Sequence, residues 1–204
     1  PVPFIVIDMG TATTVSVVNS KKQYIGSTDQ PLSPEGEQSA RLCAGAGDET
    51  VSKVYSSPMR RCLLSSRIFY PKARVEICPL LREMDFGLFE EKNYEDLGAD
   101  PLYQQWLDSN CQDPCPEGES MEEFAKRVCQ GFEEVMDKAC SQEETQVVIL
   151  AHGGTLMALM GRYALPQRGY FQWQTPNCGG YKAHWDEKSR HLVDWSPLAL
   201  EERK

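Results

Sequence analysis

Residues 147–165 read VVILAHGGTLMALMGRYAL, and their pattern indicates the fold class. The apolar run VVILA is typical of a buried β-strand, and the pair Gly153-Gly154 predicts a tight turn after it. The apolar TLMALMGRYAL that follows predicts a helix. His152 stands at the junction, where backbone N–H groups of the turn and the helix N-terminus favour an anion. We therefore expect an α/β protein with His152 at the edge of its sheet.

The same alternation of strand and helix continues on both sides of this stretch. Ser33 precedes Pro34 as a helix N-cap, and Ser120 with Glu123 forms a capping box. Alternating strands and helices predict a mostly parallel sheet covered on both faces, within one domain of residues 1–204. The expected strands are 4–8, 51–56, 73–78, 147–151 and a C-terminal hairpin around DEKS, and the expected helices are 34–43, 58–67, two short pieces within 93–110, and one from 121.

Composition restricts the class of protein. A net charge of −9 on 204 residues argues against a nucleic-acid or anionic-membrane surface. No apolar run approaches the ~20 residues that span a bilayer, and the N-terminus has no signal-peptide pattern. The eight cysteines are scattered, which predicts reduced thiols in a cytoplasmic protein, and Cys111 and Cys115 lack the spacing of a metal site. We expect no cofactor and no metal.

Three segments carry residues suited to phosphate chemistry. Arg60 and Arg61 lie in the first turn of a helix that follows a strand, where the helix dipole disfavours positive charge. An anion bound by both arginines would explain their place. For Arg60, a solvated surface role is also open. His152 stands at its strand-turn-helix junction, and Glu83 follows the third strand as a possible general acid. Together they suggest that the protein binds or transfers a phosphoryl group.

Five stretches resemble the histidine phosphatase superfamily, which includes phosphoglycerate mutase, fructose-2,6-bisphosphatase and α-ribazole phosphatase. They occur in the family's order: YIGSTDQPLSPEGEQSA (24–40), VYSSPMRRCLLS (54–65), LREMDFGLFEEKNYEDL (81–97), PEGES (116–120) and VVILAHGGTLMALM (147–160). The resemblance implies a three-layer α/β/α sandwich of the phosphoglycerate mutase type. The chain looks most like the α-ribazole phosphatase type, which handles small substrates.

The resemblance also implies roles for individual residues. Arg61 would bind phosphate, Glu83 would donate a proton to the leaving group, and His152 would be the second active-site histidine, with Gly153 beside it in phosphate binding. Thr28 and Asn177 lie in segments that border the substrate in the family.

The first strand departs from the family. Where the family has Arg-His-Gly, with the histidine as nucleophile, this chain has Asp8-Met9-Gly10. A thioether cannot form a phosphoenzyme, and a carboxylate close to a phosphate dianion would cost on the order of 4 kcal/mol at an effective dielectric near 20. We expect Asp8 to lie within salt-bridge reach of Arg61 or His152, and phosphohistidine catalysis to be lost.

The stretch FIVIDMGTATTV (4–15) has two other local resemblances. Its Asp-x-Gly-Thr resembles the phosphate hairpin of actin-like and pantothenate kinases, and its Asp8 resembles the nucleophile of haloacid-dehalogenase-type phosphatases. The first family would need a second Gly-rich phosphate loop. The second would need an aspartate two residues later, where Gly10 stands.

The leading hypothesis is a pseudophosphatase that binds a phosphorylated small molecule or a protein partner. The alternatives are an active phosphomonoesterase on a sugar phosphate or α-ribazole phosphate type of substrate, using Asp8 or a water activated by Glu83, and a regulatory domain of a larger protein. The sequence leaves the oligomeric state open.

Overall fold

The computed structural model describes residues 4–9, 22–45 and 47–198. Its centre is a six-stranded sheet in the order β3-β2-β4-β1-β5-β6, in which the first four strands are parallel and the last two antiparallel. The predicted mostly parallel sheet and C-terminal hairpin are therefore confirmed. The strands are β1 (Phe4–Met9), β2 (Lys53–Ser56), β3 (Arg74–Ile77), β4 (Gln146–Ala151), β5 (Gly180–Asp186) and β6 (His191–Pro197).

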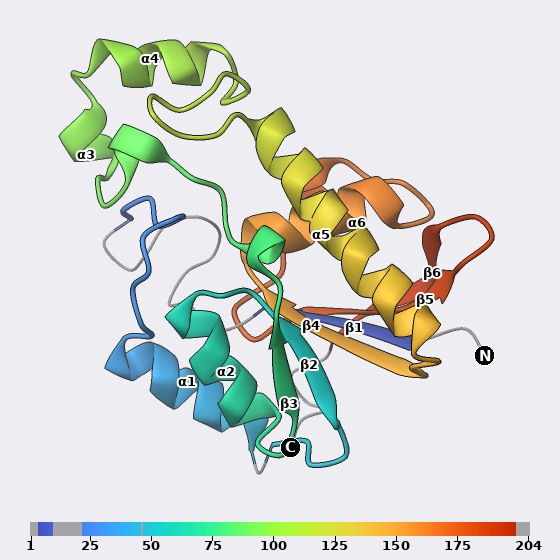
Figure 1. The fold of residues 1–204 in the computed structure, drawn as a ribbon. Helices are drawn as coiled ribbons and strands as arrows, with labels where there is room; N and C mark the ends of the chain where they lie inside the picture. The colour runs from blue at the N-terminus through green and yellow to red at the C-terminus, as the bar shows by residue number, and fades with distance from the viewer. Residues whose placement is uncertain (1–3, 10–21, 46, 199–204) are drawn as a thin grey trace.

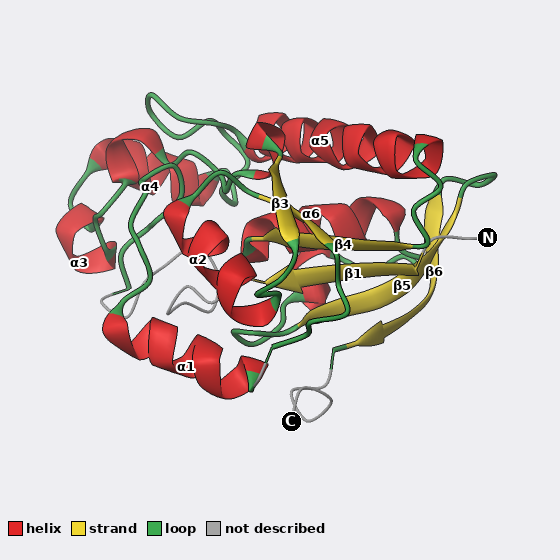
Figure 2. Ribbon diagram, turned by 60° about the horizontal axis from the view of Figure 1, so that its bottom comes forward, coloured by secondary structure: helices red, strands yellow, loops and turns green. Residues whose placement is uncertain are grey.

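Helices cover both faces of the sheet and complete the three-layer sandwich. The helices α5 (Met121–Ser141) and α6 (Gly153–Tyr163) lie on one face, and α1 (Pro34–Ala44) and α2 (Arg60–Phe69) lie on the other (Figure 1). The two short helices α3 (Tyr94–Leu97) and α4 (Pro101–Asp108) lie beyond the carboxyl ends of the parallel strands (Figure 2). In the described ranges, no helix has the length and apolar character needed to cross a membrane.

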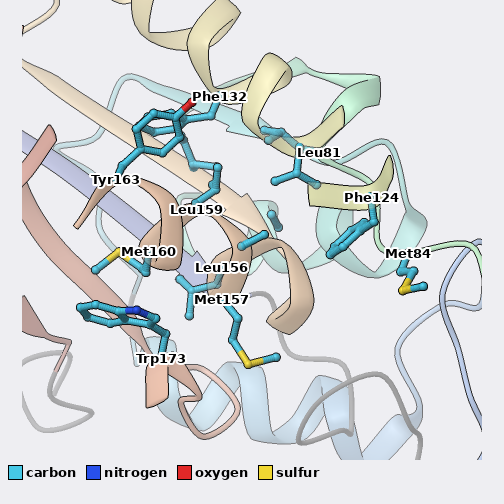
Figure 3. Packing of buried hydrophobic residues seen from close by; sticks show 14 of the residues in the cluster. Leu81, Met84, Phe124, Phe132, Leu156, Met157, Leu159, Met160, Tyr163 and Trp173 are labelled. Carbon is cyan, nitrogen blue, oxygen red and sulfur yellow. The ribbon is translucent and has the colours of Figure 1, made fainter. Parts of the chain in front are cut away.

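The central strand β4 supplies both hydrophobic cores by simple alternation. Val147 and Ile149 pack with α5 and α6, whereas Val148 and Leu150 pack with α1 and α2, because successive side chains of a strand point to opposite faces. Figure 3 shows part of the larger core, where Phe132 from α5 lies close to Tyr163 from α6, with ring centroids 4.8 Å apart. This double burial explains why β4 is apolar along its whole length after Gln146.

Most of the expected element boundaries agree with the structure, but two helices do not begin where expected. The helix α6 begins at Gly153, inside the pair predicted as a tight turn. Ser33 caps α1 through the amide of Gly36, and Ser120 and Glu123 form the predicted capping box of α5. The prediction that α2 begins at Pro58 is wrong, because the backbone of Met59 is still extended and the helix begins at Arg60. The cap comes instead from a distant segment: the Arg60 amide donates to the Asp29 carboxylate at 2.7 Å.

An aromatic cluster joins the α3–α4 segment to the rest of the fold. The Tyr24 ring lies 5.2 Å from Phe86 and 5.8 Å from Trp106 between centroids, and its hydroxyl bonds that of Tyr103 at 2.8 Å. Offset and edge-on aromatic contacts of this kind add stability beyond their buried area. The chain after Tyr24 is therefore anchored before it passes the edge of the sheet at Gly26–Asp29.

Candidate functional site

The carboxyl ends of three neighbouring strands define the site. In the register of the sheet, Leu150 of β4 pairs with both Ser56 of β2 and Asp8 of β1, and Met9 pairs with Ala151. Ala151 directly precedes His152, so the backbone of position 9 ends beside the histidine at the crevice where open α/β sheets bind ligands.

His152 is the N-cap residue of α6 and is only 6% exposed. Its Nε2 lies 2.7 Å from the Ser57 hydroxyl, and its Nδ1 lies 3.3 Å from Nε of Arg61. Because a guanidinium can only donate, Nδ1 must be the acceptor, which assigns the proton to Nε2 and its hydrogen bond to Ser57. Burial, followed by the positive charges of Arg61 and Arg127, holds the pKa of His152 well below its usual value. The imidazole is therefore neutral at neutral pH.

Arg61 points inward from the first turn of α2 and is 4% exposed. Its Nη1 donates to the carbonyl of Thr28 and its Nη2 to the carbonyl of Gly26, each at 2.9 Å. Together with the bond to His152, the described residues engage three of the five N–H groups that a guanidinium carries. The other two N–H groups have no partner among the described residues.

The neighbouring Arg60 has a different role from the one predicted for the pair. Its guanidinium lies against Asp29, with 2.6 Å from Nη2 to the Asp29 carbonyl and 3.3 Å from Nε to the carboxylate. Its side chain is 62% exposed. The expectation that both arginines share one anion is therefore wrong: the protein's own Asp29 neutralises Arg60, and Arg61 alone enters the site.

Glu83 reaches the site from the segment after β3 and is 2% exposed. Its Oε1 accepts from the amide of Met84 and its Oε2 from the amide of Gly154, both at 3.0 Å. The carboxyl group occupies the space that a side chain at position 154 would need, because a Cβ there would lie 2.4 Å from Oε1. Burial raises the pKa of Glu83, which favours the protonated acid that a proton donor must supply.

Arg127 of α5 holds the segment that carries Glu83. Its guanidinium binds the Glu119 carboxylate through two bonds, 2.6 Å from Nε and 2.7 Å from Nη2. It also donates to three carbonyls of the approach to the site, those of Leu80, Arg82 and Glu83, at 2.8, 3.1 and 3.1 Å. All the hydrogen-bonding capacity of this fork is used in holding the chain, as suits a planar bidentate donor.

The structure thus brings Arg61, Glu83 and His152 together, while their catalytic roles stay predictions. Thr28 reaches the group through its carbonyl. Gly153 is the first residue of α6, directly after the junction at His152. The Oδ1 atom of Asn177 is buried and has no hydrogen-bond partner among the described residues, which leaves its border role a prediction.

The side chains of Asp8 and Met9, and Gly10 altogether, lie outside the described residues. The predicted salt bridge of Asp8 therefore stays a prediction. For the described residues, no group of three or more metal-ligating side chains is present. All eight cysteines are free thiols. Cys62 lies next to the site, 3.5 Å from Nε2 of His152, and burial raises the pKa of its thiol to about 12, so it remains protonated.

Sequence reasoning missed the residues that hold the site together. Ser57 lies in the quoted motif before Arg61, and its place at the end of a strand was the available signal. Arg127 carries no local signal for its role, since the three carbonyls that it holds lie more than 40 residues away in the chain.

Comparison with known proteins gives a consistent result. The model of the histidine phosphatase superfamily (branch 1) matches residues 12–197. A protein of Hydrogenobacter thermophilus with the provisional name phosphoserine phosphatase 2 is 34% identical over 150 residues, which cover 71% of this chain and 72% of the relative.

Solved structures share the fold along almost the whole chain. The α-ribazole phosphatase of Shigella flexneri superposes with a TM-score of 0.75 at 21% identity, over 91% of this chain and 92% of its own. The phosphoglycerate mutase of Thermus thermophilus superposes with a TM-score of 0.66 at 25% identity, over 96% and 98% of the two chains.

Proposed function

Because the chain belongs to the histidine phosphatase superfamily (branch 1), we propose that it binds small phosphate monoesters and hydrolyses them without a phosphohistidine at position 9. The names of its relatives support the substrate class, since phosphoserine, phosphoglycerate and α-ribazole phosphate are all small phosphate monoesters. The pseudophosphatase, which we favoured from the sequence, becomes the second candidate.

One observation carries the proposal. Arg61 is buried at the carboxyl edge of the sheet with two N–H groups still free of the described residues, beside the helix N-terminus at Gly153. A cationic fork and a helix N-terminus together favour a phosphate group. Glu83 adds a proton-donating carboxyl group at the same helix N-terminus.

The route of hydrolysis must differ from that of the family. In the proposed step, a water molecule or the Asp8 carboxylate attacks phosphorus, the phosphorus–oxygen bond of the ester breaks, and Glu83 protonates the departing alkoxide. If water attacks, its proton passes to a phosphoryl oxygen of the product. If Asp8 attacks, water then cleaves the acyl phosphate and restores the carboxylate. In either route Glu83 takes up a proton from solvent before the next turnover. His152, being neutral, adds no charge to the pocket, so Arg61 supplies the positive charge at the phosphoryl oxygens.

The second candidate is a protein that binds a phosphorylated small molecule or a partner without turnover. Met9 favours it, because the thioether leaves no nucleophile where the family has its histidine. The two candidates predict the same binding and differ only in hydrolysis.

Phosphate release from phosphoserine, phosphoglycerate and sugar phosphates, measured beside calorimetric binding of inorganic phosphate, tests both candidates. The proposal predicts turnover that survives Met9→Ala and is lost in Glu83→Gln and Arg61→Met. Loss of turnover in Asp8→Asn would identify Asp8 as the nucleophile, and its persistence would favour water. Binding without any release would support the second candidate, and failure to bind phosphate would refute both.

A rebuilt motif gives an independent check. Met9→His alone should recover little phosphohistidine activity, because Asp8 still repels the phosphate. The double change Asp8→Arg with Met9→His should exceed the sum of the single changes, as expected for residues that act as a unit.

A further inference from the structure

The carboxylate of Glu90 occupies an anion-binding loop of the protein itself. It accepts hydrogen bonds from three successive backbone amides, those of Gly26, Ser27 and Thr28, at 3.1, 2.8 and 3.2 Å. The Thr28 hydroxyl donates to it at 2.6 Å, and the Phe86 amide donates at 3.1 Å. Successive N–H groups that converge in this way form a concavity for an anion, and here a side chain fills it.

The opposite side of the same loop faces Arg61. The carbonyls of Gly26 and Thr28 accept from the two terminal nitrogens of Arg61, each at 2.9 Å. The loop is therefore held between a carboxylate on its amide side and a guanidinium on its carbonyl side. Because Gly26 has no side chain, the chain can pass close to Met84 and Glu90, where a Cβ would lie 1.7 Å from the Met84 carbonyl.

This arrangement links Glu90 to the site through fixed contacts. Glu90 aligns the loop, the loop carbonyls orient the Arg61 fork, and Arg61 in turn donates from Nε to His152 at 3.3 Å. The influence of Glu90 on Arg61 passes through the backbone of Gly26–Thr28, which both side chains contact. The Glu90 side chain comes from the segment after the short 3₁₀ turn Gly87–Phe89, far from Arg61 and His152 in the sequence.

We propose that Glu90 is a positioning residue that holds Arg61 in its phosphate-binding orientation by filling the amide concavity of Gly26–Thr28. The proposal rests on the proposed phosphate-binding role of Arg61. It goes further in assigning the alignment of that arginine to a carboxylate that does not touch the ligand.

The variant Glu90→Gln keeps the shape of the side chain and removes its charge. One oxygen becomes an amide nitrogen that cannot accept from the loop, so part of the concavity loses its partner. Glu90→Asp keeps the charge with a shorter reach and serves as the conservative variant. Glu91→Gln is the matched control, because Glu91 is the exposed neighbour and its carboxylate contacts only Gln30, at 2.8 Å, among the described side chains.

Two measurements separate positioning from mere destabilisation. The first is calorimetric affinity for inorganic phosphate, which should fall at least about tenfold in Glu90→Gln, or about 1.4 kcal/mol. The second is the rate at which the Arg61 Nε–H exchanges with solvent, followed by NMR; the signal is assigned by its loss in Arg61→Lys. In Glu90→Gln this rate should rise by about tenfold or more as the hydrogen bond to His152 loosens. Glu90→Asp should lie between wild type and Glu90→Gln in both measurements, and Glu91→Gln should match wild type.

Unchanged affinity together with unchanged Nε–H exchange in a folded Glu90→Gln protein would overturn the inference. The same holds if Glu91→Gln produces equal effects, since any loss of charge near the loop would then suffice. A wild-type protein that binds no phosphate would refute the proposed function alone, because exchange at Arg61 would still show whether Glu90 positions it.

Discussion

Replacing Gly154 by alanine should destabilise the protein through its contact with Glu83. The added Cβ would lie 2.4 Å from Oε1 of Glu83, and real Cβ atoms do not come closer than 3.0 Å, so the carboxyl group must move by at least 0.6 Å. It has little free space to enter, since Glu83 is 2% exposed. The shift would weaken both of its hydrogen bonds, to the amides of Met84 and Gly154.

The size of the effect follows from those two bonds. Leaving buried hydrogen-bonding groups without partners costs about 1–2 kcal/mol each, or about 2–4 kcal/mol together. The helix propensity of alanine returns up to about 1 kcal/mol, because position 154 lies in the first turn of α6. The net loss in the free energy of unfolding should therefore be about 1–3 kcal/mol.

Gly161→Ala is the matched control in the same helix. Its Cβ would meet Trp173 at 3.9 Å, an ordinary contact, so only the propensity gain of up to about 1 kcal/mol remains. The free energies of unfolding of the two variants, measured in urea, should thus differ by about 2–4 kcal/mol. This corresponds to a difference of roughly 5–15 °C in Tm for a chain of this size. Equal stabilities of the two variants would contradict the clash between position 154 and Glu83. In a Glu83→Ala background the cost of Gly154→Ala should vanish, and its persistence would locate the clash elsewhere.

Two further predictions concern the partners of the site. His152→Gln should flatten the acid side of the curve of stability against pH. Because the pKa of His152 is lowered in the folded protein, only the unfolded chain takes up this proton below about pH 6.5, so wild type should lose up to about 2 kcal/mol between pH 6.5 and 5.0 relative to the variant. Urea unfolding across this pH range measures the difference, and parallel curves would contradict the buried neutral imidazole. Arg127→Met should cost about 3–5 kcal/mol in the free energy of unfolding, because Glu119 keeps only Arg82, at 3.4 Å, as an ionic partner and the carbonyls of Leu80, Arg82 and Glu83 lose their donor. Arg190→Met, at an exposed pair with Asp137, should change it by less than about 0.5 kcal/mol. Similar losses for both would mean that the contacts of Arg127 are no more than surface contacts.

Local sequence patterns are enough to predict the layers of the fold and the position of the site along the chain. Apolar strands with alternating or continuous patterns, separated by capped helices, require a sheet that buries both faces, and VVILAHGG shows where its central strand ends. Local signals of this kind need no tertiary context, because caps, turns and hydrophobic periodicity act within a few residues. The same locality places Arg61, Glu83 and His152 at strand ends, which in a parallel sheet meet at one edge.

How those residues are used depends on contacts that form in the folded protein. Arg60 and Arg61 are equivalent in the sequence, yet Asp29 captures the first and the carbonyls of Gly26 and Thr28 orient the second. The start of α2 moved from Pro58 to Arg60 for the same reason, since its cap comes from Asp29, 31 residues away. Contacts between distant segments leave no periodic trace in a single sequence. They form only when packing brings the segments together, and burial then decides which charges must find a partner.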